Sequence, residues 1–311
     1  MHGFELPTPL RGIVPPLVTP LMDRDRLDVS GLEHLVEHIL TGGVHGLFLL
    51  GSTGEGPSLS YPLRRELIER VCGQVGGRVP VLVGITDTAY TESLRVASCA
   101  ADAGAEAVVL APPCYFPPGQ NDLYLYVRHL ASESPLPVFL YNMPGLCKVA
   151  FEPETVRRLL DLPGVVGLKD SSGDMIYFHE VRRVVRQRPD FSLLVGPEQL
   201  LAEAVGCGAH GGVCGGANLL PRLYIDLYEA AQTNDRQQVA SLHERVMEVA
   251  GQLYTLEPGA AGYLKGLKCA LACVGLCDNV LAEPLHCFDE AQRTTLRERL
   301  ARLEIGTAVP Y

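Results

Sequence analysis

Lysine is scarce in this sequence, tryptophan is absent, and no apolar run is long. Only four of the 26 basic residues are lysines, at positions 148, 169, 265 and 268. Arginine keeps its proton in proteins, whereas a lysine removed from water becomes a neutral amine nucleophile. Lys169 ends the apolar run 164–168, so it is a candidate for amine chemistry. Pairing with a buried carboxylate is the alternative interpretation.

The sequence also has no excess of positive charge, and this excludes some classes of binding partner. The 311 residues carry a formal net charge of −10, and no basic stripe indicates binding to nucleic acid or to an anionic membrane. The apolar runs are too short to span a bilayer, and residues 1–5 do not begin a secretory signal peptide. We therefore expect a cytoplasmic protein that binds neither nucleic acid nor membrane.

Two patterns resemble metal sites but have a simpler explanation. Ten cysteines are scattered among apolar neighbours, without the spacing of a disulfide scaffold. Cys269, Cys273 and Cys277 recur every fourth residue, which is typical of one packed helical face rather than of zinc ligands. Residues 34–38 fit the His-x-x-Glu-His zinc spacing, although a solvated helical face explains them equally well. We predict no metal site.

Short β-rich runs alternate with helical patterns eight times along the chain. We predict a (β/α)₈ TIM barrel, an α/β fold, over residues 1–233. A doubly wound open sheet is the alternative, but it favours a Gly-x-Gly-x-x-Gly turn between a strand and a helix. The one match to that spacing, from Gly206 to Gly211, leads into a strand instead. The predicted strands are 12–21, 46–51, 79–86, 106–113, 136–142, 165–170, 191–196 and 211–216. The helical patterns between them are 30–40, 62–75, 91–103, 122–131, 153–160 and 175–186.

The alternation stops after position 218. A helix over 221–233 closes the eighth unit, and the 3.6-residue periodicity then predicts helices over 236–253, 262–276 and 289–303. No low-complexity linker precedes these three helices, so we expect a C-terminal three-helix extension, residues 234–311, packed against the barrel.

Candidate catalytic side chains end three of the predicted strands, where the sites of TIM barrels lie. Side chains alternate along a strand, so Lys169 should share a face with Val165 and Gly167. If that face is the barrel interior, its apolar surroundings favour the neutral amine, which condenses with a ketone to form an imine. Tyr141 ends the neighbouring strand and can move protons. Ser52 and Thr53 end the second strand, where donors can hold a substrate carboxylate.

The motifs Gly-Ser-Thr-Gly-Glu at 51–55, Tyr-Asn-Met-Pro at 141–144 and Gly-Leu-Lys-Asp at 167–170 resemble the dihydrodipicolinate synthase / N-acetylneuraminate lyase family. The resemblance covers nearly the whole chain. It implies an imine-forming barrel enzyme that acts on pyruvate or a related 2-oxo acid without metal or other cofactor. It also implies a homotetramer, built as a dimer of dimers.

The resemblance assigns roles position by position. Lys169 matches the imine-forming lysine, Tyr141 the proton-relay tyrosine, and Ser52 with Thr53 the hydroxyl pair at the substrate carboxylate. Tyr115 matches the tyrosine that reaches into the neighbouring subunit's site, with Cys114 in place of its usual tyrosine partner. Three further matches are to substrate-binding positions: Ser171, Glu198 and the backbone of Val213.

The specificity positions match neither namesake. Synthases have arginine where this chain has Leu146, and N-acetylneuraminate lyases have Asp-Glu and serine where it has Glu198, Gln199 and Gly215. Lys148 stands where the family often has glycine, either exposed to solvent or facing a distal carboxylate. We predict a lyase, aldolase or dehydratase, acting on pyruvate or a 2-keto-3-deoxy sugar acid. The alternatives are the two namesake activities, a metal-dependent aldolase and a non-catalytic paralogue that binds a small acid.

Overall fold

The computed structural model describes residues 6–306. The predicted domain limits 1 and 311, and the expectation about residues 1–5, lie outside the described residues.

Eight parallel strands form the central sheet, in the order β1-β10-β9-β8-β7-β6-β5-β4. Phe48 of β4 then pairs with Pro16, just after β1: the Leu17 amide donates to the Phe48 carbonyl at 2.8 Å, and the Phe48 amide donates to the Pro15 carbonyl at 2.9 Å. These bonds close the sheet into the predicted barrel. The strands are β1 Gly12–Ile13, β4 Leu47–Leu49, β5 Val81–Gly84, β6 Ala107–Leu110, β7 Val138–Asn142, β8 Val165–Asp170, β9 Ser192–Val195 and β10 Gly211–Gly212.

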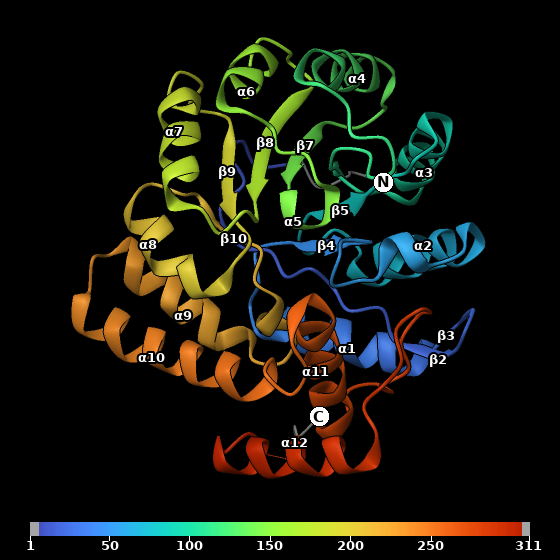
Figure 1. Ribbon diagram of the computed structural model, residues 1–311, viewed down its shortest axis with the longest axis vertical. Helices are drawn as coiled ribbons and strands as arrows, with labels where there is room; N and C mark the ends of the chain where they lie inside the picture. The colour runs from blue at the N-terminus through green and yellow to red at the C-terminus, as the bar shows by residue number, and fades with distance from the viewer. Residues whose placement is uncertain (1–5, 307–311) are drawn as a thin grey trace.

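Helices surround the strands, as Figure 1 shows for α2, α3, α4, α6 and α7. Each turns an apolar stripe inward; in α1 the buried side chains include Leu32, Leu35 and Ile39, at helical spacing. The barrel helices are α1 Val29–Thr41, α2 Tyr61–Val75, α3 Tyr90–Ala103, α4 Gln120–Glu133, α5 Pro144–Cys147, α6 Pro153–Leu159, α7 Met175–Val185, α8 Leu201–Gly206 and α9 Pro221–Gln232. Short 3₁₀ turns are η1 Gly56–Ser58, η2 Glu198–Leu200 and η3 Gly215–Asn218.

The first predicted strand, 12–21, was too long. Within this range Gly12–Ile13 forms the barrel strand, Pro16 makes an isolated bridge to Phe48, and Leu21 already belongs to a two-stranded hairpin, β2 Leu21–Asp23 paired with β3 Arg26–Leu27. Pro15, Pro16 and Pro20 interrupt the intervening segment, because proline has no amide hydrogen for a ladder.

The barrel interior has its own apolar cluster, separate from the larger one between sheet and helices. Phe139 and Tyr141 of β7 belong to the interior cluster, as the alternation predicted. The prediction for Val165 was wrong. Val138 pairs with Val165 but Phe139 pairs with Gly167, so β8 carries an irregularity that turns Val165 outward and Val166 inward. Gly167 fits beside Phe139, whose ring would lie 2.3 Å from an added Cβ.

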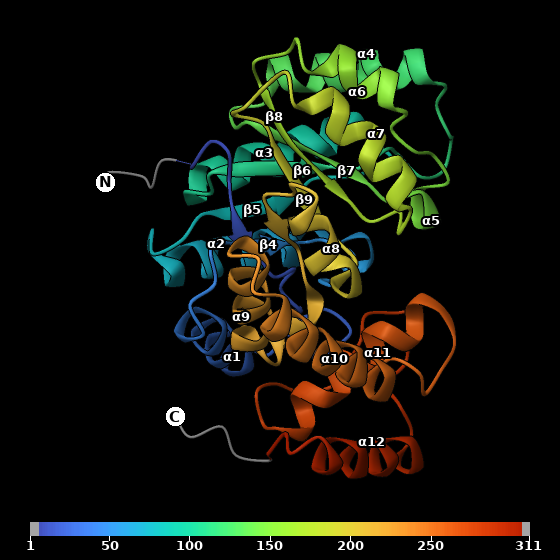
Figure 2. The same ribbon diagram turned by 90° about the vertical axis from the view of Figure 1, so that its left-hand side faces the viewer.

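The C-terminal helices are α10 Arg236–Leu253, α11 Gly259–Cys273 and α12 Glu290–Arg302. Helix α10 packs on α9, and α12 packs on α10 and α11. Figure 2 shows the three helices grouped at one end of the molecule, next to α1 and α9. Among the described residues, no helix is long and apolar enough to cross a membrane.

Candidate active site

Lys169 and Tyr141 occupy matching positions on adjacent strands. Tyr141 pairs with Lys169 in the register of β7 and β8, and their exposed fractions are only 7% and 6%. The Lys169 Nζ lies 4.2 Å from the centre of the Tyr141 ring and 5.0 Å from that of Phe48. The amine is therefore inside the barrel, against two aromatic rings, which meets the condition that the sequence analysis set for amine chemistry.

A second lysine fits the alternative interpretation instead. Lys268 of α11 is fully buried, and its Nζ lies 2.5 Å from Oε1 of Glu55. Burial lowers the pKa of Lys268, although the Glu55 carboxylate opposes this effect. Within residues 6–306, none of the ion pairs includes Lys169. Lys268 is thus a structural cation, and Lys169 is the buried amine that has no carboxylate partner among them.

The two hydroxyls after β4 lie beside phenols. Ser52 Oγ is 3.4 Å from Tyr141 Oη, and Thr53 Oγ1 is 3.2 Å from Tyr263 Oη. Glu55 holds this turn in place, because its carboxylate binds Lys268 and accepts the Ala282 amide at 2.7 Å. Glu55 keeps a left-handed backbone, with φ of 56°, which these contacts stabilise.

A cavity of about 560 Å³ opens where these groups meet. Seven of the eight predicted site residues line it: Ser52, Thr53, Tyr141, Lys169, Ser171, Glu198 and Val213. Met143, Leu146, Leu264 and Leu285 add apolar surface. This volume is ample for a small organic acid.

Glu198 borders the cavity, but both of its carboxylate oxygens accept hydrogen bonds from the protein itself. Oε1 accepts hydrogen bonds from the hydroxyls of Tyr224 and Tyr254, both at 2.9 Å, and Oε2 accepts the Gly216 amide at 2.7 Å. Burial raises the pKa of Glu198 above that of an ordinary carboxyl group, against these donors. The carboxylate is therefore held in one orientation at the cavity wall.

Ser171 and Val213 lie at the ends of β8 and β10. The Ser171 amide donates to the Asn142 carbonyl at 2.8 Å, and its hydroxyl fits beside Gly196, where an added Cβ would lie 1.9 Å from Oγ. The Val213 amide donates to the Val195 carbonyl at 2.8 Å, which fixes the strand end against the cavity.

Tyr115 is the one predicted site residue that does not line this cavity. Its side chain is 77% exposed, and the ring packs edge-on against exposed Phe116 at 5.0 Å. Lys148 is exposed, and its Nζ donates to the Gly145 carbonyl at 2.9 Å.

The chain matches known proteins over nearly its full length. Residues 9–303 match the sequence model of the dihydrodipicolinate synthetase family. A 4-hydroxy-tetrahydrodipicolinate synthase from Methanopyrus kandleri is 32% identical, covering 97% of each chain. The structure resembles that of dihydrodipicolinate synthase from Bacteroides thetaiotaomicron, with 51% identity, a TM-score of 0.92, and coverage of 95% of this chain and 99% of the other. It also resembles a pyruvate complex of YagE from Escherichia coli K12, with 27% identity, a TM-score of 0.89, and coverage of 95% and 99%.

The chain belongs to the dihydrodipicolinate synthetase family. Members of this family are pyruvate-dependent lyases that form a Schiff base, and the predicted fold and family are confirmed. Leu146, which stands at one of the specificity positions named from the sequence, is 44% exposed and lines the cavity.

Two tyrosines of the C-terminal extension form part of the cavity wall. Tyr254, just after α10, and Tyr263 of α11 both line the cavity, and their rings pack edge-on with centroids 4.7 Å apart. Sequence reasoning missed them because they lie more than 20 positions beyond the end of the barrel and belong to no strand end. The glycine at position 215 is the one local signal, since it leaves space that Tyr263 fills.

The two sequence patterns considered for metal binding lie elsewhere. Residues 34–38 belong to α1, outside the barrel; His38 Nε2 lies 3.1 Å from the Leu219 carbonyl oxygen, and Glu37 pairs with Arg78 at 2.6 Å. Helix α11 ends at Cys273, so Cys277 does not extend the predicted helical face. Within residues 6–306, no three His, Cys, Asp or Glu side chains gather as a metal site would require.

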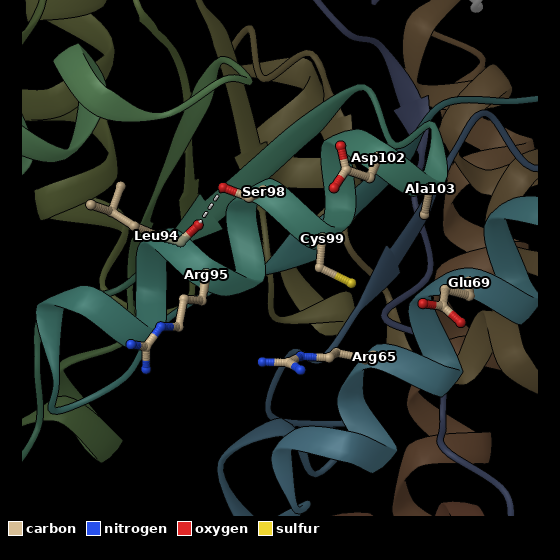
Figure 3. A pocket seen from close by; sticks show the side chains of 8 residues that line it. All are labelled: Arg65, Glu69, Leu94, Arg95, Ser98, Cys99, Asp102 and Ala103. Carbon is tan, nitrogen blue, oxygen red and sulfur yellow. Dashed lines mark hydrogen bonds between the residues drawn. The ribbon is translucent and has the colours of Figure 1, made fainter.

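Two further hollows are not lined by Lys169. A cavity of about 430 Å³ adjoins the first, shares Ser52, Tyr141 and Leu146 with it, and reaches the buried Arg64–Asp87 ion pair. A further hollow lies between α2 and α3 on the outer layer, where Figure 3 shows side chains of both charges around Cys99. Its lining residues are Arg65, Glu69, Leu94, Arg95, Ser98, Cys99, Asp102 and Ala103.

Proposed function

We propose that the chain is a metal-independent lyase that binds a 2-oxo acid as an imine on Lys169. The observation that carries the proposal is the pairing of Lys169 with Tyr141 on adjacent strands, inside a cavity and without an ion-paired carboxylate among residues 6–306. The amine adds to the ketone carbon, and the resulting carbinolamine loses water to give the imine. The protonated imine then accepts the electron pair of the carbon–carbon bond that breaks. In a dehydration it instead accepts the pair of the C–H bond next to the imine, whose proton leaves, and the resulting enamine expels the next hydroxyl group, which departs with a proton as water.

Tyr141 is the proton carrier in this proposal. Its hydroxyl lies at the mouth of the barrel beside Ser52, which can pass a proton on to solvent or substrate. The proton that leaves the amine during addition goes to the departing water by this route. Ser52 and Thr53 hold the substrate carboxylate through their hydroxyls, beside the turn that Glu55 fixes.

The charges in the cavity favour a substrate with a single carboxylate. Among the described residues that line it, Lys169 is the only lysine or arginine. A second carboxylate, such as that of aspartate semialdehyde, would have no cationic partner there, because Leu146 takes the place of the synthase arginine. We therefore propose a 2-keto-3-deoxy sugar acid as the substrate, cleaved or dehydrated to pyruvate or a related product. N-acetylneuraminate, which also has one carboxylate, is the second candidate.

The proposal includes the assembly implied by the family. Exposed Tyr115 and its neighbour Phe116 form an apolar patch that suits a subunit contact. We propose that Tyr115 acts in the site of a second copy, within a homotetramer built as a dimer of dimers in the cytoplasm.

Reductive trapping tests the proposed function. Incubation with pyruvate and borohydride should add a pyruvate-derived group to the peptide that contains Lys169, detectable by mass spectrometry. Binding of pyruvate without an adduct would support the non-catalytic alternative, and turnover abolished by chelators would support the metal-dependent one. A panel of keto-deoxy sugar acids, N-acetylneuraminate and aspartate semialdehyde with pyruvate then identifies the substrate.

A further inference from the structure

Tyr263 joins the C-terminal extension to the substrate turn. Its hydroxyl lies 3.2 Å from Thr53 Oγ1, across 210 positions of sequence, and its ring packs edge-on against Tyr254. Tyr254 in turn donates to Glu198. One end of the cavity is therefore lined by phenol and alcohol hydroxyls that come from the barrel and from the extension.

The space that Tyr263 occupies depends on the glycine opposite it. A Cβ added at Gly215 would lie 1.6 Å from the Tyr263 oxygen and 2.8 Å from the ring carbon that bears it. The backbone of Gly215 lies outside the left-handed region that favours glycine, so its conformation does not require a missing side chain. The absence of a side chain at 215 is explained by the phenol that fills the space.

The Tyr263 hydroxyl is neutral and has hydrogen-bonding capacity left over. Burial raises the pKa of this phenol, so it keeps its proton at any physiological pH. A tyrosine hydroxyl can donate one hydrogen bond and accept others. Within residues 6–306 its hydrogen-bond partner is Thr53 alone. The remaining capacity lies at the cavity wall, where the described lining offers no cation except Lys169.

We propose that Tyr263 is a specificity-determining residue that binds a hydroxyl group on the part of the substrate beyond the imine carbon. The inference rests on the proposed imine chemistry and adds the chemical class of the second half of the substrate: an uncharged, hydroxylated chain. Tyr254 and Glu198 hold the Tyr263 ring and the cavity wall in place. An aldehyde partner of the same length without hydroxyls leaves the phenol without its substrate hydrogen bond.

The test compares two aldehydes as partners for pyruvate: glyceraldehyde, and propanal, which has three carbons but no hydroxyls. We expect the unmodified protein to prefer glyceraldehyde by kcat/KM, and Tyr263→Phe to reduce that preference by about tenfold or more, because it removes only the hydroxyl. Tyr228→Phe is the matched control. Tyr228 is a buried tyrosine packed edge-on against His45, away from the cavity, and its substitution should leave the preference unchanged.

The outcomes separate this inference from the proposed function. If the unmodified protein gives no adduct with pyruvate and borohydride, the imine proposal itself fails. If it gives the adduct but condenses with neither aldehyde, or if Tyr263→Phe slows both aldehydes equally, the specificity role is wrong and Tyr263 is only structural.

A second variant pair tests the geometry independently of the aldehydes. Gly215→Ser should displace Tyr263, lower the thermal midpoint and reduce the preference for glyceraldehyde. Gly215→Ser combined with Tyr263→Leu should recover the thermal midpoint, because the smaller side chain makes room, while the preference stays low. Equal thermal midpoints for Gly215→Ser and the unmodified protein would show that the phenol does not occupy the space above Gly215.

Discussion

Tyr141 and Lys169 lie opposite each other on adjacent strands, with the lysine Nζ 4.2 Å from the centre of the tyrosine ring. The ring face shields one side of the amine and its hydroxyl extends toward Ser52. The pair provides a nucleophile and a proton carrier from neighbouring strand ends, which is the minimum that imine formation requires.

Lys169→Arg and Lys169→Met should both abolish turnover, by at least about a thousandfold, because neither side chain can form an imine. The arginine variant keeps the positive charge and so separates charge from nucleophilicity. Steady-state kinetics and borohydride trapping provide the measurement, with circular dichroism as the control for folding. Residual trapping in the arginine variant would assign the imine to another amine.

The Lys169–Tyr141 pairing could be predicted from sequence because barrel strands that follow each other in sequence are neighbours in space, and each side chain ends its strand. The outward turn of Val165 could not, because strict alternation of faces holds only until an irregularity shifts the register. The first strand was predicted too long for a related reason, since three prolines remove ladder donors without removing the apolar pattern.

The contacts between the C-terminal extension and the site could not be predicted from the sequence. Tyr263 reaches Thr53 across 210 positions, and Lys268 reaches Glu55 across 213. No local periodicity connects such distant residues. The local sequence around a lysine in an apolar helix does not indicate whether its partner is a carboxylate or a ketone. The strand end and its motif singled out Lys169, but only the tertiary contacts assign Lys268 to Glu55.

Tyr115 should act across subunits if the proposed assembly is correct. Tyr115→Phe should slow turnover by roughly a hundredfold, the low end of the effect expected for a lost proton-transfer group. Mixing it with Lys169→Met should restore activity, because half of randomly exchanged dimers contain one site with both intact residues. We expect about a quarter of the unmodified activity in that mixture. Mixed oligomers confirmed by mass spectrometry but without recovery would refute the cross-subunit role.

Lys268→Met should destabilise the protein by about 3 kcal/mol or more, because it leaves the Glu55 carboxylate buried without its cation. Adding Glu55→Gln should recover most of this loss, since no buried charge then remains and the glutamine oxygen can still accept the Ala282 amide. Lys265→Met is the control: its partner Glu257 is partly exposed, so the free energy of unfolding should fall by less than about 1 kcal/mol. Urea unfolding measures all three. Equal losses for Lys265→Met and Lys268→Met would contradict the distinction between them.

His210 should make stability depend on pH below neutrality. Its Nδ1 accepts the Leu193 amide at 2.9 Å, and burial, with a smaller effect of Arg11, lowers its pKa to about 4. The folded state therefore disfavours protonation, while the unfolded chain takes up a proton near the ordinary histidine pKa of about 6.5. The contribution of neutral His210 to the free energy of unfolding is complete above about pH 6.5. It is lost as the pH drops from about 6.5 to about 4, and the free energy of unfolding falls with it. Because the imidazole is only half-buried, solvent screening limits the loss to about 1–2 kcal/mol.

His210→Asn tests this assignment, because the asparagine carbonyl can accept the same amide without titrating. The difference in the free energy of unfolding between pH 7 and pH 4.5 should be smaller in the variant than in the unmodified protein. The remaining slope includes His38 and His45, whose pKa values burial also lowers. An unchanged pH dependence in His210→Asn, with stability at pH 7 retained, would move the effect from His210 to those two histidines or to the carboxyl groups.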